Sequence, residues 1–178
     1  MTYNSVAQIF ERIDETRERL YSRVEGLSDE QAAKRPSPNA WSVKEIIEHL
    51  SIIEDRLLRM MTMMLMKAES AGAGSSNGPV EIKPFSLEKL IERSRNEKYD
   101  APEAVRPSGQ VTLADSLAKM RRSREELHGL RSRVETTDLS GATYPHPVGA
   151  ALNFYEWLAF IGVHEERHLR QIDSVLSS

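Results

Sequence analysis

The sequence predicts an all-α protein, a four-helix bundle with one long crossover between its second and third long helices. Four long segments carry apolar residues at helical spacing, and each opens with a residue that can cap a helix. Between these segments there is no alternation of apolar and polar residues typical of strands, and no internal repeat. The connection of about 40 residues between the second and third segments fits a bundle with a crossover.

The first long helix is predicted from Asn4 to Glu25, with Gly26 as its stop. Apolar residues lie along one of its faces, at Val6, Ile9, Phe10, Ile13, Leu20 and Val24. A short helical piece follows at 28–35, before Pro36.

The second long helix is predicted to start at Ser42, where the letters SVKE form a capping box. The Ser42 hydroxyl can accept a hydrogen bond from the Glu45 amide, and the Glu45 side chain can reach back to the start of the helix. The helix continues with an apolar stripe made of Ile46, Leu50, Ile53, Leu57 and Met60 or Met61.

The methionine-rich run MTMMLM, from Met61 to Met66, is apolar on all sides of this helix. Its most common use is as core filler or as an oligomer contact, and the second interpretation is the floor of an apolar ligand pocket. A soft-metal site is the weakest interpretation, because no other soft ligand lies nearby in the sequence. We expect a homodimer contact on this surface.

The third long helix is predicted to open at Thr112 and to reach Val134, and the fourth opens at Asn153 and reaches Leu176. The crossover at 68–110 contains the small-residue run AGAGSSNGP and a short element at 86–93. The connection at 136–152 has two X-Pro steps, which predict an ordered extended segment.

Length and composition exclude several classes of function. A chain of 178 residues suits a single domain over 1–178, and 24 basic against 27 acidic residues give a net charge of −3. This balance argues against a nucleic acid or an anionic membrane as the main partner. The chain has no cysteine, which excludes disulfides and thiolate ligands. No signal peptide or membrane span is visible, so we expect a soluble cytoplasmic protein.

The stretch HEERH, from His164 to His168, fits the H-E-x-x-H pattern of zinc proteases. Histidines four residues apart on a helix can converge on one metal ion. Two observations nevertheless oppose a protease. The charged Glu166 and Arg167 stand where such enzymes usually have uncharged residues, and the ten residues after His168 contain no His or Glu as third ligand.

A third ligand must therefore come from upstream, where the histidines are His49, His128 and His146. His49 lies within the apolar stripe of the second long helix and can meet His164 and His168 across the core. We interpret His128 as a boundary residue, whereas His146 lies in a loop before the fourth long helix. The alternative to a metal site is a set of hydrogen-bonded core histidines.

Two stretches resemble the DinB/YfiT-like superfamily. The first is WSVKEIIEHLSIIE at 41–54, and the second is HPVGAALNFYEWLAFIGVHEERHLRQI at 146–172. The resemblance implies an up-down four-helix bundle in which His49, His164 and His168 bind one divalent metal ion, either zinc, nickel or iron. In the region at 68–110 we identify no matching motif.

Three protein ligands leave a metal position open to water or substrate. The resemblance thus implies a metal-dependent hydrolase, or a transferase that uses a low-molecular-weight thiol, acting on a small molecule. We favour this enzyme over the alternative, a non-enzymatic metal-stabilised binding module or stress-related interaction module. Glu165, expected beside the metal or on the bundle surface, and His146 are candidate catalytic residues.

The residues that orient the histidines can also be predicted. Metal-bound imidazoles usually donate their second N–H group to a carboxylate, carbonyl or amide. Glu45, one turn before His49, and Gln171, three residues after His168, have suitable spacing. For Glu45 we favour the capping box.

Overall fold

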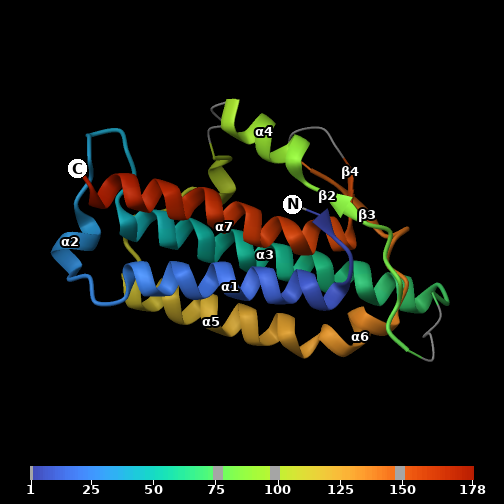
Figure 1. The fold of residues 1–178 in the computed structure, drawn as a ribbon. Helices are drawn as coiled ribbons and strands as arrows, with labels where there is room; N and C mark the ends of the chain where they lie inside the picture. The colour runs from blue at the N-terminus through green and yellow to red at the C-terminus, as the bar shows by residue number, and fades with distance from the viewer. Residues whose placement is uncertain (1, 74–77, 97–100, 147–150) are drawn as a thin grey trace.

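Four long helices lie side by side in the computed structural model, which describes residues 2–73, 78–96, 101–146 and 151–178 (Figure 1). They are α1 (Val6–Val24), α3 (Val43–Ser70), α5 (Leu113–Gly129) and α7 (Phe154–Leu176). Helix α7 packs against both α1 and α3, and α3 also packs against α5. The predicted four-helix bundle is confirmed.

The crossover between α3 and α5 returns the chain to the end of the bundle at which α3 begins (Figure 1). Ion pairs join Arg124 of α5 to Glu54 and Arg133, just beyond the end of α5, to Glu69, so residue numbers increase in the same direction along α5 and α3. Helices α1 and α7 likewise run parallel to each other and antiparallel to this pair (Figure 1). A short loop could not connect parallel neighbours, and the long crossover is therefore required by this order.

Side-chain caps fix the start of each long helix. Ser42, Thr112 and Asn153 accept hydrogen bonds from backbone amides three residues later, as predicted. Ser42 and Asn153 belong to full capping boxes, in which a glutamate side chain also accepts from the cap residue's amide. Helix α1 starts at Val6, two residues after the predicted start at Asn4, because Ser5 is its cap.

The third predicted helix is divided in the structure, which corrects the expectation of one continuous element. Helix α5 ends at Gly129, and the short α6 (Arg131–Thr136) begins after Leu130. Glycine has a low helix propensity, and the Leu130 amide bonds the carbonyl of Leu127 rather than that of residue 126. The helical periodicity continues across this break, so the sequence pattern does not reveal it.

Two small antiparallel strand pairs were not predicted. Strand β1 (Thr2–Tyr3) pairs with β2 (Phe85–Ser86), and β3 (Thr143–Pro145) pairs with β4 (Ala151–Asn153). Strands of two or three residues are too short for an alternating pattern to be detected. The pair formed by β3 and β4 shows extended backbone in the described parts of the segment before α7, at 143–145 and 151–153.

The remaining elements are helices α2 (Asp29–Ala33) and α4 (Glu88–Asn96) and the 3₁₀ helix η1 (Glu103–Val105). Helix α4 corresponds to the element predicted at 86–93. Part of the predicted AGAGSSNGP linker, at 74–77, and the loop at 147–150 lie outside the described residues. In the described part of the chain, no helix combines the length and the apolar character needed to cross a membrane.

The core consists of two apolar clusters with a charged layer between them. Each long helix contributes one residue to this layer: Arg17, Glu54, Arg124 and Glu165, all buried. The methionine run is divided between core and surface, because Met61 and Met64 are buried whereas Met63 and Met66 are more than half exposed.

Candidate metal centre

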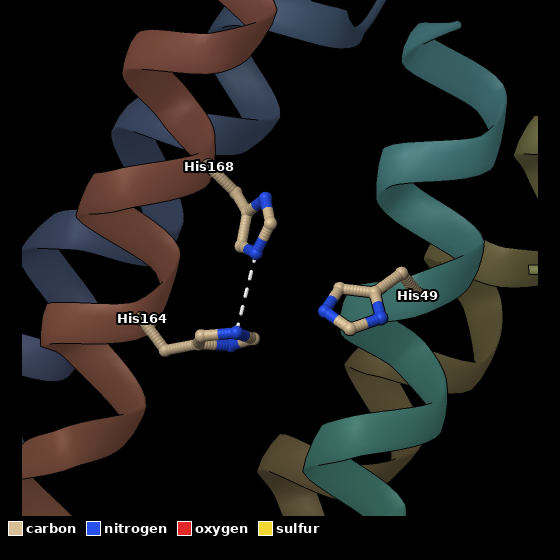
Figure 2. Close-up of side chains that lie close together, drawn as sticks. All are labelled: His49, His164 and His168. Carbon is tan, nitrogen blue, oxygen red and sulfur yellow. Dashed lines mark hydrogen bonds between the residues drawn. The ribbon is translucent and has the colours of Figure 1, made fainter. Parts of the chain in front are cut away.

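Three histidines from two helices converge at one place in the bundle (Figure 2). His49 comes from α3, and His164 and His168 come from successive turns of α7. One ring nitrogen of each lies within 4.8 Å of the others, and the two Nε2 atoms of His164 and His168 are 3.2 Å apart. Nitrogens bound at about 2.0–2.1 Å to a tetrahedral zinc ion would be about 3.3 Å apart. The residues present therefore fit a metal ion.

Hydrogen bonds from the opposite ring nitrogens orient two of the imidazoles. His49 Nδ1 lies 2.7 Å from the carbonyl oxygen of Val105, and His168 Nδ1 lies 2.8 Å from Gln171 Oε1. Each acceptor favours the tautomer with hydrogen on Nδ1 and leaves the Nε2 lone pair for a ligand. The prediction for Gln171 is confirmed. For His49, the partner is Val105 and not Glu45, which remains in the capping box and bonds Arg35.

Aromatic rings pack around the same imidazoles. Trp41 contacts His49 with ring centroids 5.0 Å apart, and Phe160 stacks on His164 at 5.5 Å. Burial lowers the pKa of each of the three histidines, and it lowers that of His168 to about 3. All three are therefore neutral at pH 7, which is the form that binds metal ions.

The crossover is held in place by a buried carboxylate of α3. Glu48 accepts hydrogen bonds from the amide and hydroxyl groups of Ser108, at 2.8 and 2.7 Å, and from the Gly109 amide at 2.9 Å. These bonds fix the segment that carries Val105, and thus the acceptor for His49. The crossover, in whose sequence no motif was identified, is part of the site.

An open pocket of about 910 Å³ lies over the histidines. Its walls come from α3, α4, α7 and the crossover, and its other lining residues include Trp41, Arg106, His146, Trp157, Phe160 and Arg167. Among the described residues, the cluster contains no fourth His or carboxylate. The methionines of the run 61–66 do not line this pocket, which argues against the second interpretation of the run, while the burial of Met61 and Met64 fits the favoured interpretation as core filler.

His146 lines the pocket but is not part of the three-histidine cluster. Its ring packs on Trp157 at 5.1 Å and on Phe160 at 4.8 Å, and burial lowers its pKa. His128 lies elsewhere, partly exposed, with its Nε2 3.0 Å from an oxygen of Asp14. The interpretation of His128 as a boundary residue is confirmed.

Glu165 lies in the charged layer of the core, neither on the surface nor in the wall of the pocket. Its Oε1 accepts hydrogen bonds from Arg17 and Arg124, and both arginines also bond Glu54. Burial raises the pKa of Glu165, and the two arginines oppose this effect. The sequence expectation for its position is therefore wrong, because a rotation of about 100° from His164 points it into the bundle.

Comparisons with known proteins agree with this architecture. A family model described as the DinB superfamily matches residues 12–172. The uncharacterized protein YuaE of Bacillus subtilis is 31% identical over 167 residues, which cover 91% of this chain and 93% of YuaE.

Solved structures extend the comparison to the fold. The four-helix bundle protein TT2238 has a TM-score of 0.62 at 19% identity, with 96% of this chain and 99% of that chain covered. YfiT from Bacillus subtilis, described as a probable metal-dependent hydrolase with an unusual four-helix bundle topology, has a TM-score of 0.59 at 17% identity. That alignment covers 96% of this chain and 85% of YfiT.

Proposed function

The chain belongs to the DinB superfamily, and on this premise we propose that it is a metal-dependent enzyme of the hydrolase or thiol-transferase type that acts on a small molecule. The observation that carries the proposal is the convergence of three neutral histidines on an open pocket without a fourth ligand among the described residues. Catalytic metal sites keep such a position for substrate, whereas structural sites close it with protein ligands.

The protein's own residues would hold and orient the ion. His49, His164 and His168 provide the ligands, and Val105 and Gln171 fix the rings of His49 and His168. When bound, a divalent ion supplies Lewis acidity to a polar group of the substrate or to the nucleophile. Zinc, nickel and iron all suit imidazole ligands.

Hydrolysis is the first reaction class that we propose. The structural neighbour YfiT is described as a probable metal-dependent hydrolase, and a pocket open to solvent gives water access. Thiol transfer is the second class, and because the chain has no cysteine, the thiol would have to be an external low-molecular-weight compound. The alternative is a non-enzymatic binding module. A metal ion with a purely structural role in such a module would be expected to have four protein ligands.

His146 is the pocket residue that we propose for proton transfer. Its lowered pKa keeps the imidazole neutral at pH 7, so that it can accept a proton. Replacement by Gln should reduce kcat and leave the metal content unchanged. We assign Glu165 to the charged layer and not to catalysis, because its carboxylate is bound by Arg17 and Arg124.

The test is a screen of protein loaded separately with zinc, nickel or iron(II). Ester, amide and phosphoester hydrolysis would be measured, together with transfer of added thiols to a chromogenic electrophile. We expect turnover that falls by more than about a hundredfold in His49→Ala and is unchanged in His128→Ala. Stoichiometric metal without turnover in any assay would favour the binding module. Turnover that survives in His49→Ala would contradict the proposed site.

A further inference from the structure

The pocket over the histidines has an unbalanced charge. Its described lining includes two arginines, Arg106 and Arg167, and no aspartate or glutamate. This is unexpected in a chain with 27 acidic and 24 basic residues. A divalent ion held by three neutral imidazoles would add to the positive charge, because these ligands do not neutralise it.

Arg167 differs from the arginines beside it. Arg19 and Arg170 both form ion pairs with Glu166, on the outer side of α7. Arg167 directly precedes His168, lines the pocket and forms no ion pair with any described carboxylate. Its charge is felt by all three histidines, whose pKa values it lowers in addition to the effect of burial.

Arg106 brings a second guanidinium to the pocket from the crossover. Its Nε donates a hydrogen bond of 2.8 Å to the carbonyl oxygen of Ala101, which restrains the side chain. No described carboxylate pairs with Arg106, so its two terminal nitrogens can donate to a ligand. A guanidinium presents parallel N–H groups that match the two oxygens of a carboxylate.

Three buried carboxylates on the helices that line the pocket are each bound within the protein. Glu48 accepts three hydrogen bonds from Ser108 and Gly109, and Glu45 is bound by Arg35 and the start of α3. Glu165 is neutralised within the charged layer. A concave site lined by one sign of charge attracts ligands of the opposite sign.

The remainder of the pocket is apolar. Aliphatic and aromatic side chains line it, at Ile53, Leu57, Leu90, Trp157, Phe160 and Val163. A volume of about 910 Å³ is at the upper end of the range of about 300–1,000 Å³ that is usual for small-molecule sites. The ligand can therefore have a sizeable apolar part.

We propose that the pocket binds an amphipathic organic acid, with its carboxylate recognised by Arg106 and Arg167 and its apolar body against Trp157 and Phe160. The inference deepens the proposed function, since it names the substrate class of the same site. It does not depend on the reaction, because the arginines and the apolar wall are present with or without a metal ion.

Tryptophan fluorescence provides the test. Both tryptophans of the chain, Trp41 and Trp157, line the pocket, so that a ligand bound there changes their emission. Metal-free and zinc-loaded protein would be titrated with octanoate, octan-1-ol and octylamine. We expect octanoate to bind at least about tenfold more tightly than the alcohol or the amine, in both forms of the protein.

Variants then assign the effect to the arginines. Arg167→Gln should weaken octanoate binding about tenfold and leave octan-1-ol unaffected, and Arg106→Gln should act in the same direction. Arg170→Gln is the matched control, because this arginine lies on the same helix and pairs with Glu166 outside the pocket lining. It should bind octanoate like the wild type.

Two results would overturn the proposal: octanoate that binds no more tightly than octan-1-ol, or octanoate affinity unchanged in the Arg106→Gln and Arg167→Gln double variant. Arginine-dependent octanoate binding in metal-free protein would support the proposal even if no metal-dependent turnover is found. The failure of the anion site and the failure of the enzyme are thus separate results.

Discussion

Two buried polar regions of the bundle, the charged layer and the histidine cluster, lie next to each other and differ in how their polar groups are paired. The charged layer joins two arginines to two glutamates, one residue from each long helix, so that its charges balance within the protein. The histidine cluster begins one residue away on α7, where His164 precedes Glu165, and it contains no opposite charge. Each charge of the layer is paired within it, although Glu165 Oε2 has no hydrogen-bond partner among the described residues, whereas the three imidazoles of the cluster converge beside an open pocket.

This difference shows which buried polar residues are available for a ligand. Glu165 has the sequence position of a catalytic glutamate, but its partners are Arg17 and Arg124, and its role is therefore in the core. His49 and His168 have hydrogen-bond partners outside the cluster at Val105 and Gln171, and inside it the Nε2 atoms of His164 and His168 lie 3.2 Å apart, within hydrogen-bond distance. Adjacent residues on one helix thus serve the fold and the site separately.

The largest effect is expected when the charge balance of the layer is broken. Arg17→Met leaves Glu165 and Glu54 without one of their two arginines, and it should lower the free energy of unfolding by about 3–5 kcal/mol. Arg23→Met is the control, because its ion pair with Asp173 is exposed and is worth less than about 1 kcal/mol. Urea unfolding measures both. If the free energy of unfolding fell equally in the two variants, the charges of the layer would contribute no more to stability than an exposed ion pair.

Zinc should stabilise the folded protein through the histidine cluster and not through the charged layer. Zinc at 100 times its dissociation constant should raise the free energy of unfolding by about 2.7 kcal/mol, because it binds only the folded chain. This gain should vanish in His168→Ala and persist in Arg23→Met. The same urea titration with and without zinc provides the measurement, and a gain retained in His168→Ala would refute the assignment of this ligand.

Acid should destabilise the metal-free protein through the cluster. Burial lowers the pKa of His168 to about 3, so between pH 6.5 and 3 the unfolded chain binds more protons than the folded one. Stability is therefore full above pH 6.5 and falls with decreasing pH, by up to about 1.4 kcal/mol per pH unit for this group. Unfolding of wild type and His168→Asn at pH 5 to 7 tests this, and identical slopes would contradict it.

The smallest effect is expected from an orienting residue. Gln171→Leu removes the acceptor for His168 Nδ1 and should weaken zinc binding about tenfold without abolishing it. Metal affinity can be measured by competition with a chromogenic chelator. Ser174→Leu, on the same helix but outside the pocket lining, is the control. An unchanged affinity in Gln171→Leu would show that the hydrogen bond does not orient the ligand.

Helical periodicity made the bundle predictable, and the four-residue spacing of His164 and His168 made the site predictable. His49 could be added because it lies within an apolar stripe, where an imidazole needs a partner. Val105 could not be found, since its contribution is a backbone carbonyl in a crossover without periodicity. The charged layer had a visible signal that was missed, namely charged residues at core positions, such as Arg17 between Ile13 and Leu20.

Elemental analysis of protein purified without a histidine tag tests the central claim most directly. Wild type, His49→Ala and His168→Ala would be compared after exposure to zinc, nickel or iron(II). We expect about one metal ion per wild-type chain and none in either variant. Wild type that retains no metal, or His49→Ala that retains it fully, would contradict the three-histidine site.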